Sequence, residues 1–156
     1  RRAAQPVASS IQTSSAPTRS STSSPRTANT SASNTAVAND TDLMSLAIDL
    51  GNDPGLVTSP YDGTALIAAA HLGHAEVVRR LIDAGAPLDH INNLHWTAVM
   101  EAVVLGDGGP DHQAVLDALL SAGADRSLAD RNGVTPLEHA ETRGFTEMIK
   151  RLQRAD

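Results

Sequence analysis

The sequence contains no cysteine, so it offers neither a disulfide framework nor a thiolate for catalysis or metal binding. Its only aromatic residues are Tyr61, Trp96 and Phe145, too few to form a platform on which nucleic-acid bases could stack. No apolar run approaches the roughly 18 residues that a membrane-spanning helix requires, so no membrane insertion is expected. These shortages direct attention to the distribution of charged and small residues.

The first 39 residues contain four arginines, sixteen serine or threonine residues and no acidic residue. Such a segment cannot bury enough apolar surface to offset the entropy of ordering it. Residues 1–40 are therefore predicted to be a disordered tail, either a flexible linker or, by composition, an organelle transit peptide. Residues 40–156 carry 8 basic and 18 acidic residues, a net charge of −10. An acidic domain of this kind is not expected to bind nucleic acid or an anionic membrane surface.

The remaining chain repeats itself about every 33 residues. The corresponding positions are Thr64, Thr97 and Thr135, followed by Gly73, Gly106 and Gly144. The first two threonines are 33 residues apart and the last two 38, because five residues, 107–111, are inserted between them. The inserted stretch is Gly, Pro and Asp only, so its extra length is predicted to form a loop.

Each repeat is predicted to form two helices. The threonines can accept hydrogen bonds from the amides of a first helical turn, and Pro136 is tolerated directly after Thr135. The second helices share an apolar stripe with helical spacing. Its members are Val77, Val78, Leu81 and Ile82, then Val115, Leu116, Leu119 and Leu120, then Met148, Ile149 and Leu152. Gly85 and Gly123 follow these helices and are expected to end them at positive φ.

Three motifs carry a family resemblance. Thr-Pro-Leu at 135–137, Gly-His-Ala-Glu-Val-Val at 73–78 and Ala-Gly-Ala-Asp at 122–125 resemble the ankyrin repeat, including bacterial members with a glycine-rich insertion in one repeat. The resemblance implies an all-α solenoid of about three full repeats with short β-hairpin links. The family's usual histidine after Thr-Pro-Leu is Ile67, Met100 and Glu138 here, so its hydrogen bonds are expected to be missing.

The repeat spacing gives the domain boundaries. The ankyrin-repeat domain is expected at residues 41–156, with a half-repeat at 41–57 and repeats at about 58–90, 91–128 and 129–156. The half-repeat follows from Met44 to Leu50, which match a second helix, while no first helix is visible before them. Polar residues at Glu141, Arg143 and Gln153 mark a terminal repeat, because no further repeat would pack on them.

The resemblance implies a concave binding face built from hairpin tips and inner helices. The candidate protein-binding residues carried onto this chain are Tyr61, Asp89, His90, Asn92, Asn93, His95, Trp96, Asp130, Arg131 and Asn132. Tryptophan and arginine dominate interface energies, so Trp96 is a candidate anchor. The alternatives are that Trp96 packs on its own repeat and that the Asn and Asp residues serve the turns.

Other site chemistries are weaker. His71 with His74, and His90 with His95, lack the spacing of a metal site, so no metal or other cofactor is expected. The 107–111 insertion lacks the sequence of a phosphate loop or a calcium loop, which leaves a contact loop or a tolerated insertion. Glu101 and His139 occupy matching positions of adjacent repeats, so they could form a Glu–His pair that acts in catalysis; the alternative is an ion pair or a solvated face.

The leading interpretation is a non-enzymatic protein–protein interaction module, monomeric when unbound, whose partner is another protein. One alternative is a structural or assembly role in which another chain completes the N-terminal half-repeat. A second is an enzyme that uses the Glu101–His139 neighbourhood. The resemblance to bacterial proteins, some of which are exported, favours an extracytoplasmic location, with the cytoplasm as the alternative.

Overall fold

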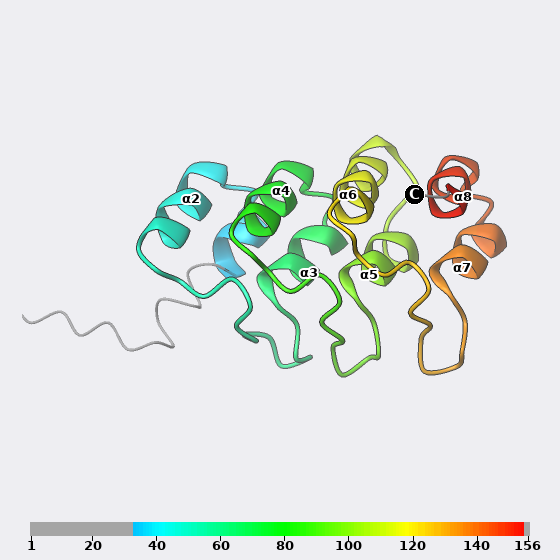
Figure 1. Cartoon of the computed structure of the whole chain (residues 1–156), viewed down its shortest axis with the longest axis horizontal. Helices are drawn as coiled ribbons and strands as arrows, with labels where there is room; N and C mark the ends of the chain where they lie inside the picture. The colour runs from blue at the N-terminus through cyan, green and yellow to red at the C-terminus, as the bar shows by residue number, and fades with distance from the viewer. Residues whose placement is uncertain (1–32, 155–156) are drawn as a thin grey trace, which may run out of the picture.

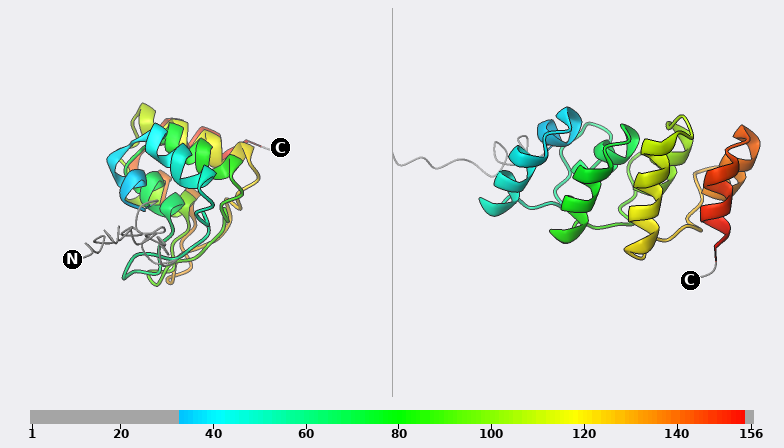
Figure 2. Two further views of the ribbon diagram at one scale, coloured as in Figure 1. Left: turned by 90° about the vertical axis from the view of Figure 1, so that its left-hand side faces the viewer. Right: turned by 90° about the horizontal axis from the view of Figure 1, so that it is seen from above.

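The computed structural model of the protein describes residues 33–154 as a stack of paired helices (Figure 1). The inner helices are α3 (Ala65–His71), α5 (Ala98–Val104) and α7 (Pro136–Arg143). The outer helices are α2 (Thr41–Asp49), α4 (Ala75–Asp83), α6 (Pro110–Ser121) and α8 (Thr146–Gln153). Each row packs sequentially, α3 on α5 and α5 on α7, and likewise from α2 through α4 and α6 to α8. The outer helices lie side by side when seen from above (Figure 2). The predicted all-α repeat solenoid is thus confirmed.

The predicted caps form in all three full repeats. The side chains of Thr64, Thr97 and Thr135 each accept a hydrogen bond from the backbone amide three residues later. Gly85 and Gly123 follow α4 and α6 at φ of +84° and +93°, a left-handed conformation that glycine adopts without steric cost. The positions read from the repeat therefore do set where these helices begin and end.

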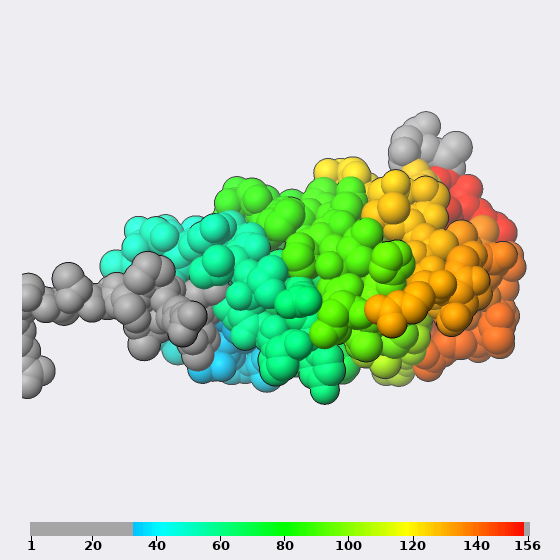
Figure 3. Space-filling model, turned by 90° about the horizontal axis from the view of Figure 1, so that it is seen from below, coloured from blue at the N-terminus to red at the C-terminus, as the bar shows by residue number. Residues whose placement is uncertain are grey.

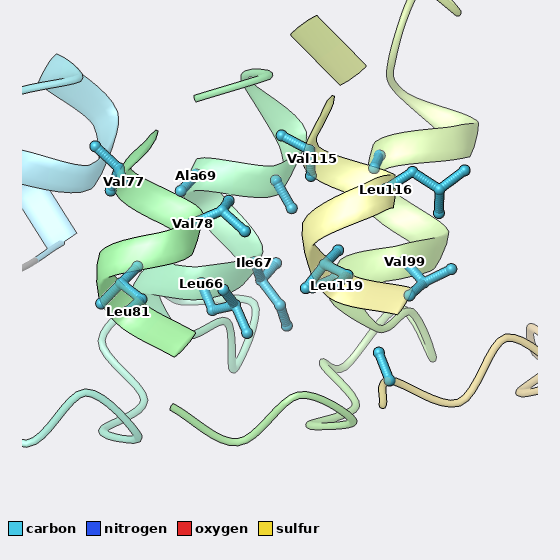
Figure 4. Close-up of a cluster of buried hydrophobic side chains, with 14 of the residues drawn as sticks. Leu66, Ile67, Ala69, Val77, Val78, Leu81, Val99, Val115, Leu116 and Leu119 are labelled. Carbon is cyan, nitrogen blue, oxygen red and sulfur yellow. The ribbon is translucent and has the colours of Figure 1, made fainter. Parts of the chain in front are cut away.

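The core lies between the two rows of helices and contains most of the apolar stripes predicted for the outer helices, together with apolar residues of the inner helices; Ile82, Leu120 and Ile149 of the stripes are only partly buried. Figure 4 shows buried side chains of this core pointing between neighbouring helices. They include Leu66 and Ile67 from α3, Val77, Val78 and Leu81 from α4, Val99 from α5, and Val115, Leu116 and Leu119 from α6. Alanines on the inner helices, such as Ala69 and Ala102, are fully buried and let adjacent helices approach closely.

The start of the described structure differs from the predicted boundary at residue 41. Residues 33–38 already form a short helical segment, on the level of the inner helices in Figure 1. The carbonyl of Ala36 accepts a hydrogen bond from His74 Nδ1 at 2.8 Å, and Ala36 is fully buried. The segment is short and its buried residues are small, so it produces no helical stripe in the sequence. Residues 1–32 of the predicted disordered tail lie outside the described residues.

The 107–111 insertion is only partly a loop, which corrects the sequence interpretation. Pro110 and Asp111 belong to α6, which has 12 residues where α4 has 9 and α8 has 8. Proline at the first position of a helix removes only an amide that has no intrahelical partner, so the insertion extends the helix. Gly108 lies against the Phe145 ring, where an added Cβ would come within 2.6 Å of the ring. Packing on the next repeat thus holds the loop.

Candidate functional site

One loop joins each of the outer helices α2, α4 and α6 to the inner helix that follows it. The three loops project from the same edge of the solenoid. Each is closed by a backbone hydrogen bond: Thr58 to Gly63, Asn92 to Trp96 and Asp130 to Val134, at 2.9 to 3.1 Å. These are the expected hairpins, although residues 33–154 contain no assigned strand. Seen from below, the loops lie next to one another, running from teal through green to orange (Figure 3).

Neighbouring loops are tied together by their tips. His90 Nε2 donates to the Asp62 carbonyl at 2.6 Å, and Asn93 Nδ2 donates to the Pro60 carbonyl at 3.2 Å. The Arg131 guanidinium donates in turn to the Asn93 carbonyl at 2.6 Å. The three loops therefore form one continuous surface, and its hydrogen bonds reduce the freedom that a partner would have to remove on binding.

The ten predicted contact residues divide into two groups. Eight lie on or beside the loop surface: Tyr61, Asp89, His90, Asn93, His95, Trp96, Arg131 and Asn132. Tyr61 is well exposed, whereas Trp96 is half-buried. Asn92 and Asp130 are buried, so placing their side chains on the contact surface was wrong. Their role is turn chemistry, the alternative that the sequence allows for the Asn and Asp residues of these loops.

Asn92 and Asp130 hold their loops with the same hydrogen bonds. Asn92 Oδ1 accepts from the amides of Leu94 and Trp96, both at 3.0 Å. Asp130 Oδ1 accepts from the amides two and four residues later at 2.8 and 3.0 Å. In the first repeat Ser59 Oγ accepts from the corresponding amides of Tyr61 and Gly63. One short polar side chain thus fixes each loop.

In the second and third repeats the side chain that fixes the loop, Asn92 or Asp130, also forms a hydrogen bond with the inner helix of its own repeat. Asn92 Nδ2 donates to Glu101 Oε1 at 2.9 Å, and His139 Nε2 donates to Asp130 Oδ2 at 2.9 Å. The two pairs occupy matching positions, but the loop residue is the donor in the second repeat and the acceptor in the third. The predicted Glu101–His139 pair does not form, because each of the two side chains binds the loop of its own repeat.

Glu101 has a second partner from the preceding repeat. Its Oε2 accepts a hydrogen bond from His71 Nδ1 at 3.2 Å, while His71 itself is half-exposed. Burial raises the pKa of the Glu101 carboxyl above its ordinary value, although the contacts with His71 and Asn92 act in the opposite direction. By contrast, the hydrogen bond from His139, with the Val134 amide, lowers the pKa of Asp130. Of these two acids, the effect of burial on the pKa is the larger one for Glu101, whereas the effect of hydrogen bonds is the larger one for Asp130.

Glu138 and Asp107 have local structural roles. Glu138 Oε2 accepts from the amide and hydroxyl of Thr135 at 2.7 and 2.8 Å, which completes a capping box. The expectation that hydrogen bonds at this family position are missing is thus wrong for Glu138. Asp107 Oδ1 accepts from the Gly109 amide and from His112 Nδ1, which orders the inserted loop.

A pocket of about 330 Å³ opens where the first loop meets α3 and α5. Its walls include the exposed apolar side chains of Val37, Tyr61, Leu94 and Leu105, and Glu101 and His71 are among its polar lining residues. Sequence reasoning missed Leu94 and Leu105 as surface residues. Their signal was a leucine within a polar loop and a leucine at the end of an inner helix.

Within residues 33–154 no three His, Asp or Glu side chains come together as a group able to hold a metal ion. Over the same stretch no helix has the length and apolar character needed to cross a membrane.

Comparison with known proteins agrees with the geometry. Residues 33–130 match the family model for ankyrin repeats in three copies. The ankyrin repeat protein YahD from Escherichia coli (strain K12) is 38% identical over 113 residues, which cover 71% of this chain and 56% of that protein. Protein PhlB from Serratia liquefaciens is 37% identical over 105 residues, 67% of this chain and 44% of its own. The chain thus spans about half the length of these relatives.

A solved structure shows the same architecture. An ankyrin repeat domain from Acinetobacter baumannii AYE, determined at 1.00 Å resolution, superposes with a TM-score of 0.60 at 37% identity. The match covers 75% of this chain and 76% of that one. With a family model over more than half of the chain and a solved relative of the same fold, the chain belongs to the ankyrin repeat family.

Proposed function

We propose that this protein binds another protein through the loop surface and the inner helices, as a non-enzymatic interaction module. Ankyrin repeats are general protein–protein interaction modules, and their fold is typically a non-enzymatic scaffold. Fold alone does not assign a binding face, which depends on the side chains that the surface exposes.

The observation that carries the proposal is exposed apolar area on a hydrogen-bonded surface. Tyr61 is 59% exposed and Leu94 43% exposed, on loops that their neighbours hold in place. Leu72 and Leu105, at the ends of α3 and α5, are also exposed. Aromatic and apolar side chains on a preorganised surface are the usual centre of a protein interface, because their burial gains energy with little loss of side-chain freedom.

A second candidate function rests on a different surface, the N-terminal end of the solenoid. Leu43, Leu46 and Leu50 form a stripe on α2 and are 51%, 51% and 76% exposed. When α2 and α4 are aligned from their first residues, the positions of Leu46 and Leu50 are taken by Arg80 and Ala84, so large apolar side chains are exposed where the next repeat has a charged or a small one. A stripe of this kind favours an assembly role in which another chain packs on α2 at the N-terminal end of the stack.

One comparison separates the two functions. The full chain, Tyr61→Ala/Leu94→Ala and Leu46→Ala/Leu50→Ala are used side by side to capture proteins from a lysate of the source organism, with mass spectrometry as readout. We expect the loop variant to lose specific captured proteins that the α2 variant retains. The reverse pattern, together with a melting temperature of the full chain that rises with its concentration, would support assembly at α2 and refute the loop surface.

A further inference from the structure

The pocket beside the first loop exists because three residues of the first repeat are small. Ser59, Gly63 and Ala68 stand where the second repeat has Asn92, Trp96 and Glu101. In the second repeat the Asn92–Glu101 hydrogen bond spans the angle between loop and inner helix. In the first repeat the side chain of Ala68 has no hydrogen-bond donor or acceptor, so it cannot form the corresponding bond to Ser59. The space that they leave open is lined by both residues.

The pocket has apolar walls and one acidic group. Tyr61, Leu94, Leu105 and Val37 line it, and each is between 43% and 59% exposed. Glu101 is its single carboxylate, and no lysine or arginine is among the lining residues. A ligand that suits these walls therefore combines an apolar stem with a group that donates hydrogen bonds to an acid.

Glu101 lacks the full positive charge that usually accompanies a buried acid. Its side chain is 6% exposed, and its partners are an amide, Asn92, and a half-exposed imidazole, His71. A buried charge without a charged partner is costly, so a cation that reaches the pocket would gain both the ion pair and charge-assisted hydrogen bonds.

We propose that this pocket binds an arginine or lysine side chain of a partner protein, with apolar residues of the partner on either side. The long methylene stem of a basic residue packs along apolar walls while its charged head reaches an acid. The net charge of −10 on residues 40–156 steers such a partner toward the domain. The inference rests on the proposed function and specifies the kind of partner segment that the loop surface recognises.

The test uses the full, isotope-labelled chain and three blocked pentapeptides. The probes are Leu-Ser-Arg-Ser-Leu and the same peptide with glutamine or glutamate in place of arginine. We expect the arginine peptide to shift the backbone amide signals of Ala68, His71, Asn92 and Glu101, and to bind at least tenfold more tightly than the other two. Equal binding of all three peptides, or shifts confined to other residues, would overturn the proposal.

Two variants test the pocket itself. Glu101→Gln removes the charge and keeps a hydrogen-bonding side chain, while Ala68→Met fills the space without a charge. Each should weaken the arginine peptide at least tenfold. Glu76→Gln is the matched control, because it removes the same charge from an exposed pair with Arg79 and Arg80 on α4 and should leave binding unchanged. Undiminished binding to Ala68→Met would overturn the assignment even if Glu101→Gln altered stability.

The chain's own N-terminal segment is the competing occupant, because Arg19 and Arg26 precede the pocket-lining Ser33. Tighter peptide binding to Arg19→Gln/Arg26→Gln would show that this segment fills the pocket and would refute a partner in trans. The capture experiment distinguishes failure of the basic-residue pocket from failure of the proposed function. Captured proteins that Tyr61→Ala/Leu94→Ala loses, but that Glu101→Gln and Ala68→Met retain, would uphold the loop surface while refuting the basic-residue pocket.

Discussion

The two ends of the solenoid use apolar side chains differently. The large apolar residues that are exposed within residues 33–154 all lie between Val37 and Leu105, and residues 106–154 contain none. At the C-terminal end Arg143 stacks on the Phe145 ring at 4.7 Å and donates to the Val104 carbonyl. A terminal repeat with polar outer residues needs no further repeat to cover it, whereas the exposed apolar residues of the preceding part of the solenoid are available for contacts.

The three full repeats also differ in the space between each loop and the inner helix that follows it. In the third repeat the Asp130–His139 pair closes it, and in the second repeat Asn92 and Glu101 do. In the first repeat Ser59 and Ala68 leave it open. Repeats with one backbone can therefore differ in function through the size of two side chains.

The largest expected effect contrasts the buried and the exposed leucines of the outer helices. Leu119→Ala on α6 removes a fully buried side chain and should lower the free energy of unfolding by about 2–5 kcal/mol. Leu46→Ala on α2 should change it by no more than about 0.5 kcal/mol, because Leu46 is half-exposed. Urea denaturation measures both. A comparable loss for Leu46→Ala would mean that the α2 stripe is covered in solution.

A smaller effect is expected when the loop side chains are removed. Asn92→Ala deletes the acceptor for two loop amides and the donor to buried Glu101, which should cost about 1–3 kcal/mol. Ser59→Ala deletes only the loop acceptor and should cost about 1 kcal/mol. Thermal melts of the two variants rank them. Equal losses would show that the bond to Glu101 contributes nothing to stability.

The smallest effects are pH-dependent and opposite in sign. Because folding raises the pKa of Glu101, the native state holds more protons there, and the parent should lose stability relative to Glu101→Gln as pH rises through the raised pKa. Because folding lowers the pKa of Asp130, its contribution is complete above the ordinary aspartate pKa and is lost as pH falls through the lowered one. Denaturation of the parent, Glu101→Gln and Asp130→Asn from about pH 3 to 8 tests both signs. If the difference in free energy of unfolding between parent and variant changed with pH in the same direction for Glu101→Gln and Asp130→Asn, the predicted opposite signs would be contradicted.

Most of the fold could be predicted because repeats make local signals recur. Thr64, Thr97 and Thr135 predict where inner helices begin, and the apolar stripes predict which face of each outer helix is buried. The helical segment at residues 33–38 escaped prediction, because a short run of small residues gives no periodic signal. The inserted residues were assigned wholly to a loop, because Pro110 is compatible with both a loop and a first helical turn.

The candidate site was predictable only in outline. The resemblance to the ankyrin repeat implies that Tyr61, Asn93 and Arg131 lie on the loops. Polarity alone cannot distinguish a contact residue from one that binds its own loop, so Asn92 and Asp130 were placed on the surface. The Glu101–His139 pair that the sequence allows does not form, because matching positions in adjacent repeats do not specify which side chain each residue reaches.

The sequence by itself determined the architecture: a 33-residue period, threonine caps, glycine helix ends and an acidic domain that follows a basic segment. These features act over a few residues or over net charge, so they can be read along the chain. Tertiary structure decided the rest, namely which polar residues are buried, how the loops join, and that Ser59 and Ala68 leave a pocket facing Glu101. Those properties depend on distances between repeats, and such distances exist only once the helices are stacked.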